Sequence, residues 1–189
     1  MRPGNAKSVY FTAHLFNYQK MPEVTLTTAE RIIIANQFQI LAQQDESSAE
    51  DYNRNADILR NGYVGLYGHV FGDISEEQPE QVTEETHRIL SMFRWIDNNL
   101  PALTDEERAQ LDLSALKFKG FDGNHDDHYH QTRFMVERLG LYDELNARDL
   151  NSHSQSTLPH YERMLAVYDT FVNKPDAFKL ENFKRLQEA

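Results

Sequence analysis

The densest group of side chains that could do chemistry lies in residues 121–134, which read FDGNHDDHYHQTRF. On a helix, His125 and His128 are three residues apart and Asp126 and His130 are four apart, so each pair shares a face. Imidazole and carboxylate together suit Zn, Mn or Fe. However, HExxH is absent and no second set of ligands with recognisable spacing occurs elsewhere. The sequence therefore predicts no metal site, and the histidine cluster stays open as an alternative.

The interpretation that we favour for the same run is structural. Asp122 is predicted to cap a helix that follows it, and Asp126 and Asp127 would stabilise the positive N-terminus of that helix. The three histidines of the run are then expected to face solvent. Arg133 is expected to pair with Asp122, and a bound anion is the alternative partner.

A second candidate is the segment from Arg148 to His153, in which four residues separate the two. This spacing is similar to the Arg-x(4–6)-His signature of the HEPN superfamily, helical domains that include metal-independent ribonucleases. In that chemistry the arginine stabilises the phosphate in the transition state and the histidine moves the 2′-hydroxyl proton. The structural alternative, which we favour, is that Asn151, Ser152 and His153 tie down a loop before the next helix. Ligand binding by the same polar group is a third possibility.

Composition and charge exclude several other classes of protein. The chain of 189 residues has no cysteine, so disulfides, thiolate metal sites and cysteine nucleophiles are absent. No serine or threonine lies in a Gly-flanked nucleophile elbow, and the glycines at 62, 65 and 68 are not followed by the Lys-Ser/Thr of a phosphate-binding loop. The aromatic residues are assigned to the core.

The net charge of −11 is a sum over two unlike pieces. Residues 1–20 contain three basic residues and no acid, which gives +3, whereas residues 21–189 contain 16 basic and 30 acidic residues, which gives −14. An acidic body of this kind repels a phosphate backbone, so coating of nucleic acid is not expected. Residues 1–20 are interpreted as an extension, either a non-native start before Met21 or an untethered arm, with targeting or partner binding as a third possibility.

The elements that must position these residues are predicted to be helices. Capping boxes open helices at Thr27 and Thr104, and Thr83 and Thr157 are predicted to cap two longer ones. Further helices are expected over residues 48–61, 125–139 and 179–188, whereas residues 63–72 are ambiguous. Residues 113–121 are the best candidate for a strand. The pattern predicts an all-α fold, a single irregular bundle of about eight helices.

Several short motifs occur together and in order from about residue 24 to the C-terminus. They are LTTAERIIIANQFQIL, NGY at 61–63, VTEETHRILSMFRWI, GFDGN at 120–124, RFMVERLG, NSH at 151–153 and YERML at 161–165. In these motifs the chain resembles the YfbU family. The resemblance implies a soluble, all-helical prokaryotic domain over residues 21–189, and no known reaction. A ligand-binding role has been suggested for the family because some members carry a DNA-binding helix-turn-helix.

These observations favour a cytoplasmic, non-enzymatic regulatory or ligand- and partner-binding domain that forms a homodimer. No cofactor, no metal and no membrane association are expected. A ribonuclease that uses Arg148 and His153 is the enzymatic alternative. The residues expected to converge on one binding cleft are Asp122, Asn124, Arg133, Asn151, His153 and Tyr161.

Overall fold

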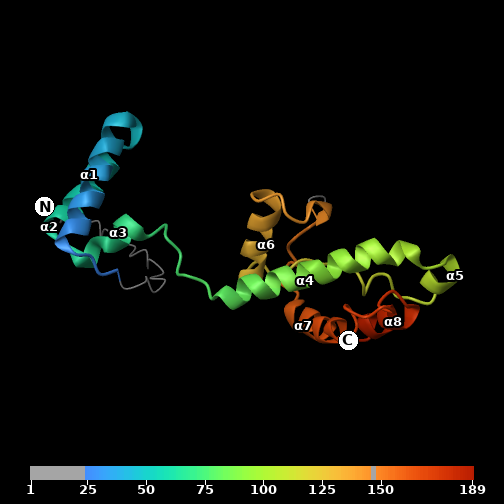
Figure 1. The fold of residues 1–189 in the computed structure, drawn as a ribbon. Helices are drawn as coiled ribbons and strands as arrows, with labels where there is room; N and C mark the ends of the chain where they lie inside the picture. Colours follow the sequence, from blue (N-terminus) through green and yellow to red (C-terminus); the bar gives the residue numbers. More distant parts are fainter. Residues whose placement is uncertain (1–23, 146–147) are drawn as a thin grey trace, which may run out of the picture. The chain divides into compact units, whose positions relative to one another are not determined.

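The computed structural model describes residues 24–145 and 148–189, and this part of the chain is all-helical, as predicted (Figure 1). It contains no named strand, and a single pair of residues forms an isolated β-bridge. The residues interpreted as an extension, 1–20, and the start at Met21 lie outside the described residues. The eight α-helices are α1 Thr28–Gln44, α2 Ala49–Asn61, α3 Tyr67–Phe71, α4 Glu80–Asn99, α5 Asp105–Arg108, α6 Asp127–Glu137, α7 Leu158–Asp169 and α8 Leu180–Gln187.

The helices fall into two compact units, where the sequence analysis expected one bundle. Unit 1 ends at Glu77 and contains α1 to α3, and unit 2 spans Gln78–Ala189 and contains α4 to α8. Each unit has a hydrophobic cluster of its own. The hydrophobic periodicity of single helices predicts that each buries a face, but it does not specify which helices share a core.

Unit 1 is a helical hairpin of α1 and α2, with α3 packed on α2 (Figure 1). Thr27 and Glu30 form the predicted capping box, in which Oγ1 of Thr27 accepts from the Glu30 amide at 3.2 Å and Glu30 accepts from the Thr27 amide at 2.7 Å. Gly62 ends α2 in the left-handed conformation, with φ +67°. The buried cluster of this unit is small and comprises Ala35, Ala56, Ile58, Leu59 and Tyr67.

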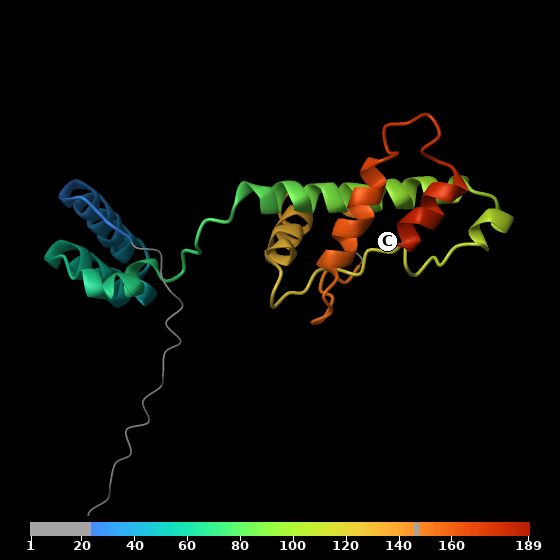
Figure 2. The same cartoon turned by 90° about the horizontal axis from the view of Figure 1, so that it is seen from below.

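Unit 2 is built around α4, its longest helix. α6 and α7 pack against α4, and α8 packs against α7 (Figure 2). The buried cluster in this unit contains twenty residues from α4, α6, α7, α8 and the segments between them. Trp95, the only tryptophan of the chain, contacts a group of aromatic rings at this core: Tyr168, Phe171, Phe178 and Phe183.

Three local predictions in unit 2 are wrong. Thr83 does not cap α4, because the helix already begins at Glu80 after Pro79, whose extended ψ of 139° ends the preceding segment. Helix α6 begins at Asp127, two residues later than expected, although a turn does precede it as predicted. Residues 113–121 do not form a strand, and only Phe121 makes a bridge.

Candidate functional site

Most of the residues predicted to bind a ligand lie where two loops of unit 2 are joined. The loops are residues 120–125 and 149–157. The amide of Phe121 donates to the carbonyl of Leu150 at 3.0 Å, and the amide of Ser152 donates to the carbonyl of Phe121 at 2.8 Å. These two bonds make the parallel bridge between Phe121 and Asn151. We call the joined segments the loop junction.

Asn151 holds both loops with its side chain. Its Oδ1 accepts from the amide of Gly123 at 3.3 Å and from the amide of His153 at 2.8 Å. A Cβ atom on Gly123 would lie 2.8 Å from Nδ2 of Asn151, so the loops approach as closely as a glycine permits. Across the same junction, Nδ2 of Asn124 donates to Oγ of Ser154 at 3.2 Å.

Tyr161 and Thr157 hydrogen bond to Gly120, at the start of the first loop of the junction. Tyr161, on α7, donates from its hydroxyl to the carbonyl of Gly120 at 3.1 Å and accepts from the amide of Lys119 at 2.8 Å. Thr157 with Pro159 opens α7, as predicted, but Oγ1 of Thr157 donates to the same Gly120 carbonyl at 2.8 Å and makes no cap bond to the helix. Burial raises the pKa of Tyr161 to about 12.

Asp122 caps its own turn instead of a helix. Its Oδ1 accepts from the amide of Asn124 at 2.9 Å, and its Oδ2 lies 2.7 Å from Nδ1 of His125. The hydrogen bond from the Asn124 amide, followed by the one from His125, lowers the pKa of Asp122. The predicted helix cap is wrong because α6 starts too late for Asp122 to reach its amides.

Arg133 is not part of the loop junction. It pairs through Nε with Oε2 of Glu137 at 2.9 Å, one turn along α6. The expected pair with Asp122 is therefore wrong. The i, i+4 spacing of Arg133 and Glu137 was a local signal for the observed partner.

Arg148 and His153 bind two different carboxylates. Nη2 of Arg148 donates to Oδ2 of Asp97, on α4, at 2.7 Å. Nε2 of His153 lies 2.6 Å from Oδ2 of Asp149. The amide of Asn151, followed by His153, lowers the pKa of Asp149. Arg148 therefore links the start of the second loop to α4, whereas the His153 side chain is exposed.

The three histidines of residues 121–134 have different environments. His125 and His130 are exposed, as predicted, but His128 is buried, with Nε2 at 3.1 Å from Oε2 of Glu85 on α4. The prediction for His128 is wrong because the face of α6 that carries it is the face that packs on α4. In residues 24–145 and 148–189, no three His, Asp or Glu side chains converge closely enough to hold a metal ion.

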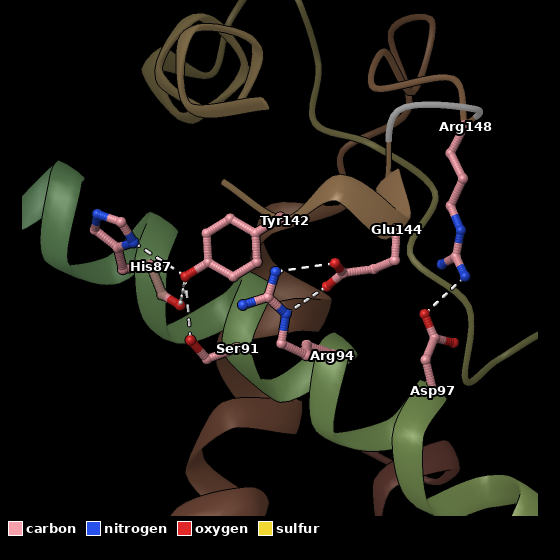
Figure 3. A network of polar contacts seen from close by, with 7 residues as sticks. All are labelled: His87, Ser91, Arg94, Asp97, Tyr142, Glu144 and Arg148. Atoms are coloured by element: carbon pink, nitrogen blue, oxygen red, sulfur yellow. Dashed lines mark hydrogen bonds and ion pairs between the residues drawn. The ribbon is translucent and has the colours of Figure 1, made fainter. Parts of the chain in front are cut away.

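A polar network that the sequence analysis missed links α4 to the segment that follows α6 (Figure 3). The buried hydroxyl of Tyr142 donates to the carbonyl of His87 at 3.1 Å and lies 3.0 Å from Nδ1 of His87 and 3.2 Å from Oγ of Ser91. The phenol has one proton, which it donates to the His87 carbonyl. Its oxygen can therefore only accept from Nδ1–H of His87 and from the Ser91 hydroxyl. Nε2 of a neutral His87 is then an acceptor.

Arg94 completes this network. It binds Glu144 with two hydrogen bonds, of 2.6 and 2.9 Å, and its guanidinium carbon lies 4.3 Å from the centroid of the Tyr142 ring. The hydrogen bond from Arg94 lowers the pKa of Glu144. Tyr142 has a φ of +55°, which is unfavourable for a residue with a side chain, so these contacts hold a strained turn in place.

The residues of the network on α4 are spaced by three and four along one face of the helix. That spacing could have indicated a shared role for His87, Ser91 and Arg94, but their partners come from tertiary packing. A cavity of about 200 Å³ opens beside the network. It is lined by His87, Arg88, Ser91, Leu165, Tyr168 and Asp169, so none of the six predicted binding residues lines it.

A match to a protein family shows which family the chain belongs to. The model of the YfbU domain matches residues 24–188. The chain belongs to the YfbU family. The match spans both units, the loop junction and the Tyr142 network, so all of these are parts of one YfbU domain. Among its described residues, none of the helices combines the length and the apolar character needed to cross a bilayer.

A second feature of this YfbU domain is an exposed apolar face on α1. Four large aliphatic residues of that helix are between 41% and 58% exposed. The same helix buries Ala35 against α2, with Ile34 and Phe38 partly buried beside it. Helix α1 therefore carries apolar residues on two sides, and the described residues of unit 1 cover only one of them. Ile33 and Ile40, seven residues apart, lie on the side of α1 that faces away from Ala35, and Ile32 and Leu41 lie at the two edges of that side. We call these four residues the outer face of α1.

Proposed function

We propose that this YfbU protein is a non-enzymatic, partner-binding domain that assembles with a second copy of itself through the outer face of α1. The observation that carries the proposal is the exposure of four aliphatic residues on a helix whose opposite side is already packed. An exposed group of large aliphatic side chains is typical of a site of protein association.

The charge of the outer face favours a second copy as the occupant. The sequence from Ile32 to Gln44 contains no charged residue, although the chain carries a net charge of −11. Two copies of an acidic protein repel each other wherever acidic surfaces meet. The contact that minimises this repulsion lies on the uncharged face.

The order of residues along α1 is compatible with a two-fold contact. In an antiparallel pairing of two α1 helices, Ile33 can face Ile40 of the second copy, and the reverse contact follows by symmetry. The same register places Asn36 opposite Gln37 of the second copy. Two amide side chains can hydrogen bond at the centre of that interface, and the isoleucines pack on both sides of it.

The loop junction supports a non-enzymatic role. Asp122, Asn151 and Tyr161 already hydrogen bond backbone amides or carbonyls of the two loops. Arg148, which a ribonuclease mechanism requires for phosphate, is bound to Asp97. The ribonuclease alternative is less well supported. It predicts that the protein degrades RNA in the presence of a chelator and that His153→Ala abolishes this activity.

Sedimentation equilibrium over a wide range of protein concentration tests the assembly. We expect the wild type to form dimers and the double variant Ile33→Asp, Ile40→Asp to be monomeric, with unchanged helix content by circular dichroism. Ile74→Asp is the matched control, because Ile74 is 66% exposed in the same unit but lies outside α1. A wild type that is monomeric at every concentration, or a control that dissociates equally, would overturn the proposal.

A further inference from the structure

Unit 1 carries a groove on the other side of its hairpin, between α2 and the segment that follows it. Its volume is about 880 Å³. One wall is a single face of α2, in which the lining residues are spaced by three and four. The opposite wall is formed by the 3-10 turn Val64–Leu66 and the start of α3. The lining residues are Glu50, Asn53, Arg54, Asp57, Ile58, Tyr63, Leu66 and His69.

The surface of the groove combines apolar side chains with acidic ones. Tyr63 is 53% exposed and Leu66 is 43% exposed, so both offer apolar area to a ligand. Ile58, which is buried in the core of unit 1, also lines the groove. Glu50 and Asp57 stand on the same face of α2, two turns apart, and place carboxylates along one wall.

The balance of charge around the groove is negative. Arg54 is the only lysine or arginine that lines it, and its Nη2 is bound to Oδ1 of Asp51 at 2.7 Å, so its charge is largely offset. In the described part of unit 1, nine acidic residues face three basic ones, a net charge of −6. The potential at the groove therefore attracts cations and repels acidic surfaces.

We infer that this groove binds a basic amphipathic helix of another protein. The argument from shape is that the groove, of about 880 Å³, follows two turns of α2 and is lined by apolar side chains on which a helix can pack. The argument from charge is that lysine or arginine beside those side chains would meet Glu50 and Asp57. A second copy of this acidic chain does not fit here, which separates the groove from the uncharged outer face of α1.

Fluorescence anisotropy with the full chain tests the inference. The probe is a labelled, amidated peptide of leucine and lysine, with leucine at helical i, i+3, i+4, i+7 spacing, and its counterpart has glutamate in place of lysine. We expect saturable binding of the lysine peptide that weakens with added salt, and no binding of the glutamate peptide. Leu66→Asp is expected to abolish binding, and circular dichroism checks that the variant remains folded.

Two matched variants distinguish the groove from general attraction to an acidic protein. Glu50→Gln with Asp57→Asn removes two charges from the groove, and Glu76→Gln with Glu77→Gln removes two charges from the same unit outside it. We expect severalfold weaker binding for the first pair and no change for the second. Equal weakening by both pairs, or no saturable binding by the wild type, overturns the inference. Loss of binding in the Ile33→Asp, Ile40→Asp variant would place the peptide on α1 and also overturn it.

Discussion

Replacement of Tyr161 by phenylalanine tests how the loop junction is held. The ring of Tyr161 packs against three phenylalanines, with centroid distances between 4.9 and 5.7 Å, and a phenylalanine keeps these contacts. Only the hydroxyl is lost. It accepts from the amide of Lys119 and donates to the carbonyl of Gly120, and Tyr161 is only 1% exposed.

The expected cost follows from the partners that remain. The carbonyl of Gly120 keeps the hydrogen bond from Thr157, whereas the amide of Lys119 loses its acceptor. The bond from the Lys119 amide is part-buried, and a donor left without an acceptor in such a place costs up to about 2 kcal/mol. We therefore expect Tyr161→Phe to lower the free energy of unfolding by about 2 kcal/mol, and Thr157→Val to cost about 1 kcal/mol because the Gly120 carbonyl keeps Tyr161. The double variant should cost more than the sum, because the carbonyl then loses both donors.

Urea unfolding followed by tryptophan fluorescence measures these differences. Trp95 is the only tryptophan and lies in unit 2, so its emission reports on the unit that contains the loop junction. The denaturation midpoint should move to lower urea in both single variants at an unchanged slope. The reasoning is refuted if Tyr161→Phe leaves the midpoint unchanged, or if Thr157→Val costs more than Tyr161→Phe.

Three further predictions concern unit 2. Thr132→Val should stabilise it by about 1 kcal/mol in urea unfolding, because Oγ1 of Thr132 is buried without a hydrogen-bond partner among the described residues. Gly120→Ala should destabilise it by roughly 2 kcal/mol or more, because φ is +83° and the new Cβ would lie 2.5 Å from backbone atoms of the facing loop; an unchanged thermal midpoint contradicts this. The amide of Asn124 lowers the pKa of Asp122, so this carboxylate stabilises the fold above its unfolded pKa, and the effect is lost as pH falls through the lower folded value. Asp122→Asn should thus flatten the acid limb of a stability–pH profile.

The parts of the fold that the sequence predicted correctly are those encoded by neighbouring residues. Thr27 and Glu30 form a capping box because each reaches the amide of the other within one turn. Thr104 and Glu107 do the same at α5. Gly62 ends α2 because it adopts a positive φ at no steric cost. These signals need no knowledge of what packs on the helix.

The parts that it missed depend on distant contacts. His128 was expected to face solvent, and it is buried because α6 turns that side toward Glu85 on α4. Thr157 carries the residue type and position of a cap, but its hydroxyl donates to Gly120, which lies 37 residues away. Asp122, Asn124, Asn151, His153 and Tyr161 were expected, with Arg133, to line one binding cleft. The hydrogen bonds that these five make within and between the two loops could not be derived from spacing.

The small core of unit 1 has a consequence for how that unit stays folded. Its cluster of fully buried apolar residues has five members, against twenty in unit 2. A small unit with little buried area is marginally stable by itself. A second copy on the outer face of α1 would add to the stability of the folded hairpin through a bimolecular equilibrium. Mass action then governs it, and the thermal midpoint of unit 1 rises with protein concentration while that of a self-sufficient core does not.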